Sequence, residues 1–79
     1  MRANRRYEML VRKGGRAPSL LDPDRVDHIE VVEIDSGEVV LFWDLLPHQT
    51  KRMARALRAD LAQLEDREFL ARWERYQAV

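Results

Sequence analysis

The chain has 79 residues with fourteen basic and fourteen acidic side chains, so its formal net charge is zero. This balance excludes a uniformly basic nucleic-acid binder, and the absence of cysteine excludes disulfides and thiolate metal sites. A chain this short buries only roughly 60% of the surface that its unfolded form exposes. We therefore expect a single domain, 1–79, with a thin core that needs very regular packing or self-association.

The charges are unevenly spread along the chain. Residues 1–16 are mainly basic, residues 17–44 are mainly acidic, and residues 45–79 are mildly basic. Only Lys13 and Lys51 among the basic residues are lysine, which fits either codon bias or a preference for forked contacts to carboxylate or phosphate. No apolar run is long enough for a signal peptide or a membrane span, so we expect a cytoplasmic protein.

The first predicted elements are a flexible basic arm over residues 1–5 and a strand over residues 6–12, which is rich in β-forming side chains. A pair of glycines ends this strand. Residues 13–27 then form a loop, in which Asp22 and Pro23 suit the start of one helical turn.

A β-hairpin is predicted over residues 28–45, because two β-branched runs flank Ser36 and Gly37. A two-residue turn at this pair would place Ile34 opposite Val39. The hairpin supplies the second and third strands of the sheet.

The second hairpin strand is predicted to be central, since Val39 to Trp43 is apolar on both faces. The predicted fold is α+β, with a three-stranded antiparallel sheet in the order 1-3-2 and the chain order β-β-β-α. A helix would cover one sheet face. The other face would need a partner subunit or the loop over residues 16–27.

A long C-terminal helix is predicted over residues 48–77, because no glycine or proline interrupts residues 48–76. Its apolar side changes along its length. At about 100° per residue, the first half gathers Met53, Leu57, Leu61 and Leu64 on one side. The second half gathers Phe69, Trp73 and Tyr76 on the opposite side. One straight helix cannot bury both stripes in the same sheet.

Two interpretations of this change of side remain. The helix breaks within residues 65–68, and Asp66 caps a second helix that folds back. Alternatively, the helix is continuous and its aromatic end packs against another subunit. Helix-forming residues fill the junction, which favours continuity.

No motif indicates an enzyme, a metal site or a cofactor. The acidic residues Asp22, Asp24 and Asp27 lack the glycine and the terminal glutamate of a calcium loop. Neither His28 nor His48 has a second ligand at metal-binding spacing. We therefore expect a non-catalytic protein.

The first predicted function is an accessory or regulatory module that acts through protein–protein contacts, as a homodimer or with another protein. Large aromatic side chains are common at such interfaces. The candidate interface residues are Phe42, Trp43, Phe69, Trp73 and Tyr76.

The alternative function is nucleic-acid binding through the N-terminal arm and the basic helix face. The candidate contacts are Arg2, Arg5, Arg6, Arg12, Lys13, Lys51, Arg52, Arg55 and Arg58. The four cations of the helix oppose the helix dipole, because they lie in its first turns. Either the sheet acids, Glu30, Glu33 and Asp44, or an external anion should neutralise them.

Overall fold

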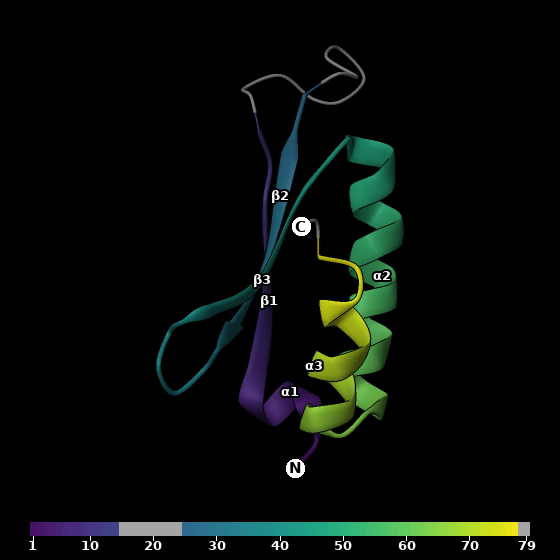
Figure 1. The fold of residues 1–79 in the computed structure, drawn as a ribbon. Coiled ribbons are helices and arrows are strands. Elements are labelled where there is room, and N and C mark those ends of the chain that lie inside the picture. The colour runs from purple at the N-terminus through teal and green to yellow at the C-terminus, as the bar shows by residue number, and fades with distance from the viewer. Residues whose placement is uncertain (15–24, 78–79) are drawn as a thin grey trace.

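A computed structural model describes residues 1–14 and 25–77 of the chain. Its elements are α1 (Ala3–Arg6), β1 (Tyr7–Arg12), β2 (Asp27–Glu33), β3 (Val39–Leu45), α2 (Pro47–Gln63) and α3 (Asp66–Glu74). The three strands form an antiparallel sheet, and the predicted α+β class is confirmed. The helices all lie on one side of the sheet (Figure 1). The turn predicted at Asp22 and Pro23 lies outside the described residues.

The strand order is β1-β2-β3, so the predicted order 1-3-2 is wrong. The central strand is β2, and β3 forms an edge. Within the apolar run of β3, Leu41 and Trp43 are buried under the helices, whereas Phe42 is exposed on the other side. The side chain of Gln77 accepts a hydrogen bond from the Phe42 N–H and donates one to its carbonyl, at 3.0 Å each. The chain end thus covers part of an edge that the sequence pattern placed between two strands.

The predicted hairpin is confirmed, but its turn is longer than two residues. Val32, rather than Ile34, lies opposite Val39. The turn covers residues 34–37, and Gly37 has a φ of 74°. This left-handed conformation favours glycine because it has no Cβ. The Ser-Gly pair therefore marks the end of a four-residue turn.

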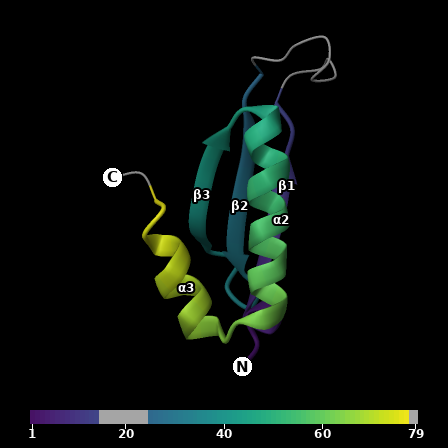
Figure 2. The same cartoon turned by 90° about the vertical axis from the view of Figure 1, so that its right-hand side faces the viewer.

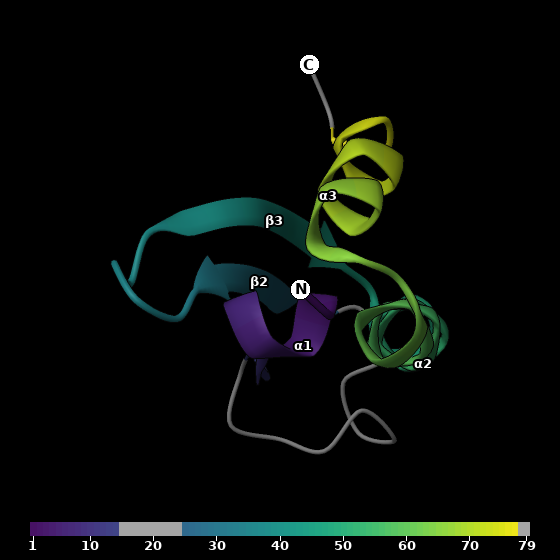
Figure 3. The ribbon, with the colours of Figure 1, turned by 90° about the horizontal axis from the view of Figure 1, so that it is seen from below.

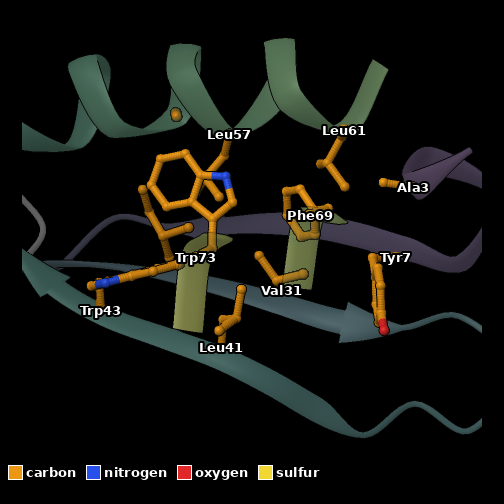
Figure 4. Packing of buried hydrophobic residues seen from close by; sticks show 11 residues of the cluster. Ala3, Tyr7, Val31, Leu41, Trp43, Leu57, Leu61, Phe69 and Trp73 are labelled. Atoms are coloured by element: carbon orange, nitrogen blue, oxygen red, sulfur yellow. The ribbon is translucent and has the colours of Figure 1, made fainter. Parts of the chain in front are cut away.

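The core lies between the sheet and the helices (Figure 4). Helices α2 and α3 lie over one face of the sheet, with α2 across β1 and β2 and α3 beside β3 (Figures 2 and 3). The Phe69 ring stacks on Tyr7 at 5.8 Å between centroids, and Trp73 meets Trp43 edge-on at 5.8 Å. Both apolar stripes of the C-terminal region thus pack on the same sheet face.

The predicted continuous helix is wrong, because the chain breaks between α2 and α3. Leu64 and Glu65 are extended, with ψ angles of 156° and 155°. The fold-back interpretation holds, although the capping position is Glu65 and Asp66 is the first residue of α3.

The N-terminal residues stabilise this break. The Ala3 N–H donates to the Leu64 carbonyl at 2.9 Å, and the Asp66 N–H donates to the Met1 carbonyl at 2.9 Å. Ala3 is fully buried in α1, so the prediction of a flexible arm over residues 1–5 is wrong. The backbone partners that end α2 come from the other end of the chain, and local helix propensity cannot reveal them.

Candidate functional site

Helix α2 carries a row of basic side chains along the edge that borders β1. Lys51, Arg55 and Arg58 are all exposed. Their spacing of four and three residues places them on one stripe of the helix. Pro47 occupies the first helical position, which its fixed φ angle suits, so the helix starts early enough to present the whole row.

This row lines a pocket of about 490 Å³ between α2 and the ends of β1 and β2. The start of α2, the end of β1 and the start of β2, which border the pocket, lie at the upper end of the molecule in Figure 1. Its apolar lining includes Val11, Pro47 and Ala54, and Lys13 and Arg25 add two further cations. Its volume falls within the usual range of ligand pockets, roughly 300–1,000 Å³.

Asp27 is the one acidic residue among the described residues that line this pocket. Its side chain is 3% exposed and lies 3.1 Å from Nε of Arg25. It also accepts a hydrogen bond of 3.0 Å from the Gly14 N–H. A buried carboxylate requires such partners. The Asp27 carboxylate therefore fixes the pocket wall and is already engaged by these groups.

Gly14 allows the two strand ends to meet at the pocket. A Cβ atom at this position would lie 1.8 Å from the carbonyl oxygen of Val26. A side chain of any size would therefore force the backbones apart. This close approach lets Lys13, which follows β1, and Arg25, which precedes β2, line the same pocket.

The sheet acids that were expected to neutralise α2 pair with other residues. The pairs are Glu30 with Arg12 at 3.5 Å, Glu33 with Arg6 at 3.2 Å, and Asp44 with His28. Within residues 1–14 and 25–77, no carboxylate forms an ion pair with Lys51, Arg52, Arg55 or Arg58. The basic row is therefore left without an internal counter-charge in the described part of the chain.

The structure separates the predicted nucleic-acid contacts into several groups. Lys13 joins Lys51, Arg55 and Arg58 at the pocket. The others lie elsewhere: Arg2 and Arg6 at the α2–α3 junction, Arg5 exposed on α1, Arg12 in an ion pair with Glu30, and Arg52 at a groove between α2 and α3. The candidate site thus combines the end of β1 with one edge of α2.

At the junction, by contrast, Arg6 is engaged within the fold. Its guanidinium lies 2.9 Å from Oδ2 of Asp66 and 3.2 Å from Oε2 of Glu33. Hydrogen bonds to Asp66 and then to Glu33 raise the pKa of Arg6, and the bond from Arg6 lowers the pKa of the Asp66 carboxyl. Arg2 likewise donates to the Gln63 carbonyl at 2.8 Å. The N-terminal cations therefore stabilise the helix break.

No protein-family model, curated protein or solved structure matches this chain. In the described residues, no group of three or more His, Asp and Glu side chains could hold a metal ion. None of the described helices has the length and apolar character to cross a membrane.

The predicted aromatic interface is divided between core and surface. Trp43 and Trp73 are each 7% exposed and Phe69 is fully buried. Their partners come from the same chain, and the indole N–H of Trp43 donates to the Tyr76 carbonyl at 3.0 Å. Phe42 and Tyr76 remain exposed at 43% and 61%. The buried aromatic residues are thus not available as a contact surface in this structure.

Sequence reasoning missed Arg25 and Asp27 as pocket residues. In the sequence, Asp27 closely follows Asp22 and Asp24 and so resembles the acids of the preceding loop. Its place in β2 gives a usable signal, because residues two apart in a strand share a face. Asp27, Ile29 and Val31 all face the core and are buried. Continuing the alternation of buried and exposed residues from Ile29 back to Asp27 therefore predicts a buried carboxylate.

Proposed function

We propose that this protein is a non-catalytic nucleic-acid-binding module that contacts phosphate groups through the basic pocket and the row of Lys51, Arg55 and Arg58. The observation that carries this proposal is the row without a carboxylate partner in the described residues. It lies beside a pocket whose acidic residue is already engaged. A cytoplasmic location remains part of the proposal.

The placement of the row favours an anionic ligand. Lys51 is the member of the row nearest the positive N-terminal end of the helix dipole, and cations three or four residues apart on a helix repel one another. A bound phosphate relieves both effects. Lys51 and Arg58 are separated by about 10 Å along the helix axis, so the row is long enough to contact more than one phosphate of a strand. The planar guanidinium of Arg55 or Arg58 can also contact phosphate through two parallel hydrogen bonds.

Binding of labelled mixed-sequence oligonucleotides, followed by fluorescence anisotropy, tests the proposal. We expect binding at low salt that weakens steeply as salt is added, because phosphate contacts release counterions. The absence of a salt-sensitive anisotropy change at micromolar protein would contradict the proposal for both single-stranded and double-stranded probes.

A matched pair of variants locates the contacts. Arg55→Gln with Arg58→Gln removes two cations from the row, whereas Arg67→Gln with Arg75→Gln removes two exposed cations from α3 and its end. Each lost phosphate contact lowers the slope of log affinity against log salt by about 0.7 for a single strand. The first variant should show this loss twice, and the second should keep the wild-type slope. Equal losses would assign binding to net charge instead of the pocket.

Protein–protein contact is a second candidate function, as a homodimer or with another protein. The exposure of Phe42 and Tyr76 supports it, because large exposed apolar side chains are enriched at interfaces. Phe42 also stacks on His28 with 5.6 Å between ring centroids, so its side chain is held in place. Sedimentation velocity over a range of concentrations tests association, and a concentration-independent monomer would argue against the homodimer.

A further inference from the structure

The helices α2 and α3 diverge over the sheet, and a groove of about 640 Å³ lies between them. The apolar part of its lining consists of Leu45, Met53, Ala56, Trp73 and Tyr76. Tyr76 is 61% exposed and lies 5.4 Å from Trp73 between ring centroids. This groove is separate from the basic pocket, because it borders the opposite edge of α2.

The rim of the groove carries two arginines. Arg52 lies along α2 beside His48, and Arg72 lies across from them on α3. The acidic residue at this groove, Asp60, is engaged by Arg72 at 3.3 Å and by the Trp73 indole N–H at 2.9 Å. An apolar groove with this rim suits an apolar segment that carries acidic side chains.

The β2–β3 turn of the same chain has this chemistry. Ile34 and Val39 are 47% and 48% exposed. Asp35 and Glu38 lie between them in the sequence, are exposed, and form no ion pair with the described residues. Figures 1 and 3 show this turn projecting from the body on the side away from the helices.

The turn is also held in one conformation. The Ser36 hydroxyl donates to Oε1 of Glu33 at 2.9 Å and accepts from the Glu38 N–H at 3.2 Å. The Gly37 N–H donates to the Glu33 carbonyl at 2.7 Å, and the Ile34 N–H donates to the Arg6 carbonyl at 2.9 Å. A preformed turn loses less conformational entropy on binding than a flexible one.

We propose that the α2–α3 groove binds the β2–β3 turn of a second copy of this chain. Ile34 and Val39 would lie on the apolar lining, and Asp35 and Glu38 would face Arg52 and the other arginine of the rim. The turn projects away from α2 and α3 (Figure 1), and these two helices line the groove, so a chain cannot place its own turn in its own groove. This inference rests on the proposed protein-contact function and is independent of nucleic-acid binding.

Charge exchange between two variants tests this contact. The groove variant carries His48→Glu and Arg52→Glu, and acidic side chains suit the first turns of a helix. The turn variant carries Asp35→Lys and Glu38→Lys at exposed positions. Sedimentation velocity on the wild type, from roughly micromolar to millimolar protein, should show the mass rising towards twice that of the monomer. Each variant alone should stay monomeric, and their equimolar mixture should associate again, because each turn then meets a groove of opposite charge.

Glu8→Lys with Glu74→Lys is the matched control, since both carboxylates are exposed and lie outside the turn and the groove. This variant should associate like the wild type. Amide NMR spectra of each variant establish that it is folded. A monomeric wild type, variants that associate unchanged, or a mixture that stays monomeric would each overturn the inference. None of these substitutions alters a residue of the basic pocket, so the salt dependence of oligonucleotide binding reports separately on the nucleic-acid proposal.

Discussion

The two ends of α2 place basic side chains in opposite circumstances. At its C-terminal end, the cations of the N-terminal segment are neutralised, as Arg6 contacts both Asp66 and Glu33. At its N-terminal end, Lys51 and Arg55 border a pocket and form no ion pair with the described residues. The first arrangement joins distant parts of the chain. The second adds electrostatic repulsion and contributes no such link.

This difference separates cations that serve folding from cations that are available to a ligand. A chain with zero net charge can carry a local basic surface when its acids are committed elsewhere, and the ion pairs of the sheet and the junction do this here. Substitutions at the junction should therefore change stability, and substitutions at the pocket should change binding.

The largest expected effect on stability concerns Phe69, which fixes α3 to the sheet beside the junction. Phe69→Ala should lower the free energy of unfolding by about 3–5 kcal/mol, because it removes a fully buried ring and leaves a cavity. Urea denaturation followed by circular dichroism measures this loss. Phe42→Ala removes the same atoms at a position that is 43% exposed, and it should cost far less. Similar losses in the two variants would show that α3 is not fixed in this way.

A smaller effect is expected in the pH dependence of stability, to which the Arg6–Asp66 ion pair at the α2–α3 junction contributes. The pKa of Asp66 in the folded protein is lower than its ordinary value of 3.8, chiefly because of the hydrogen bond from Arg6. Its stabilisation is therefore fully present above that value and is lost as the pH falls through the lower folded pKa. The urea midpoint of Asp66→Asn should be lower than that of the wild type at neutral pH and should fall less on acidification to about pH 3.

Glu68→Gln provides the control for this comparison, since it removes an exposed carboxylate from the same turn of α3. Its midpoint should follow the wild type more closely than that of Asp66→Asn. Parallel pH profiles for the wild type and Asp66→Asn would contradict the role given to the Arg6–Asp66 pair.

The smallest effect on stability is expected at the basic pocket, where removing cations should leave the protein as stable as the wild type or slightly more stable. Arg55→Gln with Arg58→Gln should leave the free energy of unfolding unchanged or raise it by about 0.3 kcal/mol, because like charges three or four residues apart on a helix repel one another. Arg6→Gln should lower the urea midpoint, since it breaks two ion pairs. A marked destabilisation by the pocket variant would show that the row has a structural role.

The fold class and the hairpin were predictable because they depend on local patterns. Alternation and β-branched residues identify the strands, and an uninterrupted run of helix-forming residues identifies the C-terminal region. The helix break could not be predicted in this way, because the backbone groups of Leu64 and Asp66 at the break form hydrogen bonds with Ala3 and Met1 at the other end of the chain. The strand order failed for a related reason: Gln77, far along the chain, covers the edge of β3 at Phe42.

The candidate site was predictable in part. Helical periodicity places Lys51, Arg55 and Arg58 on one stripe, and the lack of a nearby acid is visible in the sequence. Sequence alone could not show which cations the fold neutralises. Arg6 and Lys13 look equivalent as residues of a basic segment, yet Arg6 contacts Asp66 whereas Lys13 lines the pocket.

The comparison between the two ends of α2 is tested most directly by an NMR titration of the ¹⁵N-labelled protein with an oligonucleotide at low salt. We predict that the amide shift changes gather at Lys13, Lys51, Arg55 and Arg58, that they diminish as salt is added, and that the α2–α3 junction around Asp66 is unaffected. Shift changes centred on the junction, or no changes at any salt concentration, would contradict the assignment of the basic pocket as the nucleic-acid site.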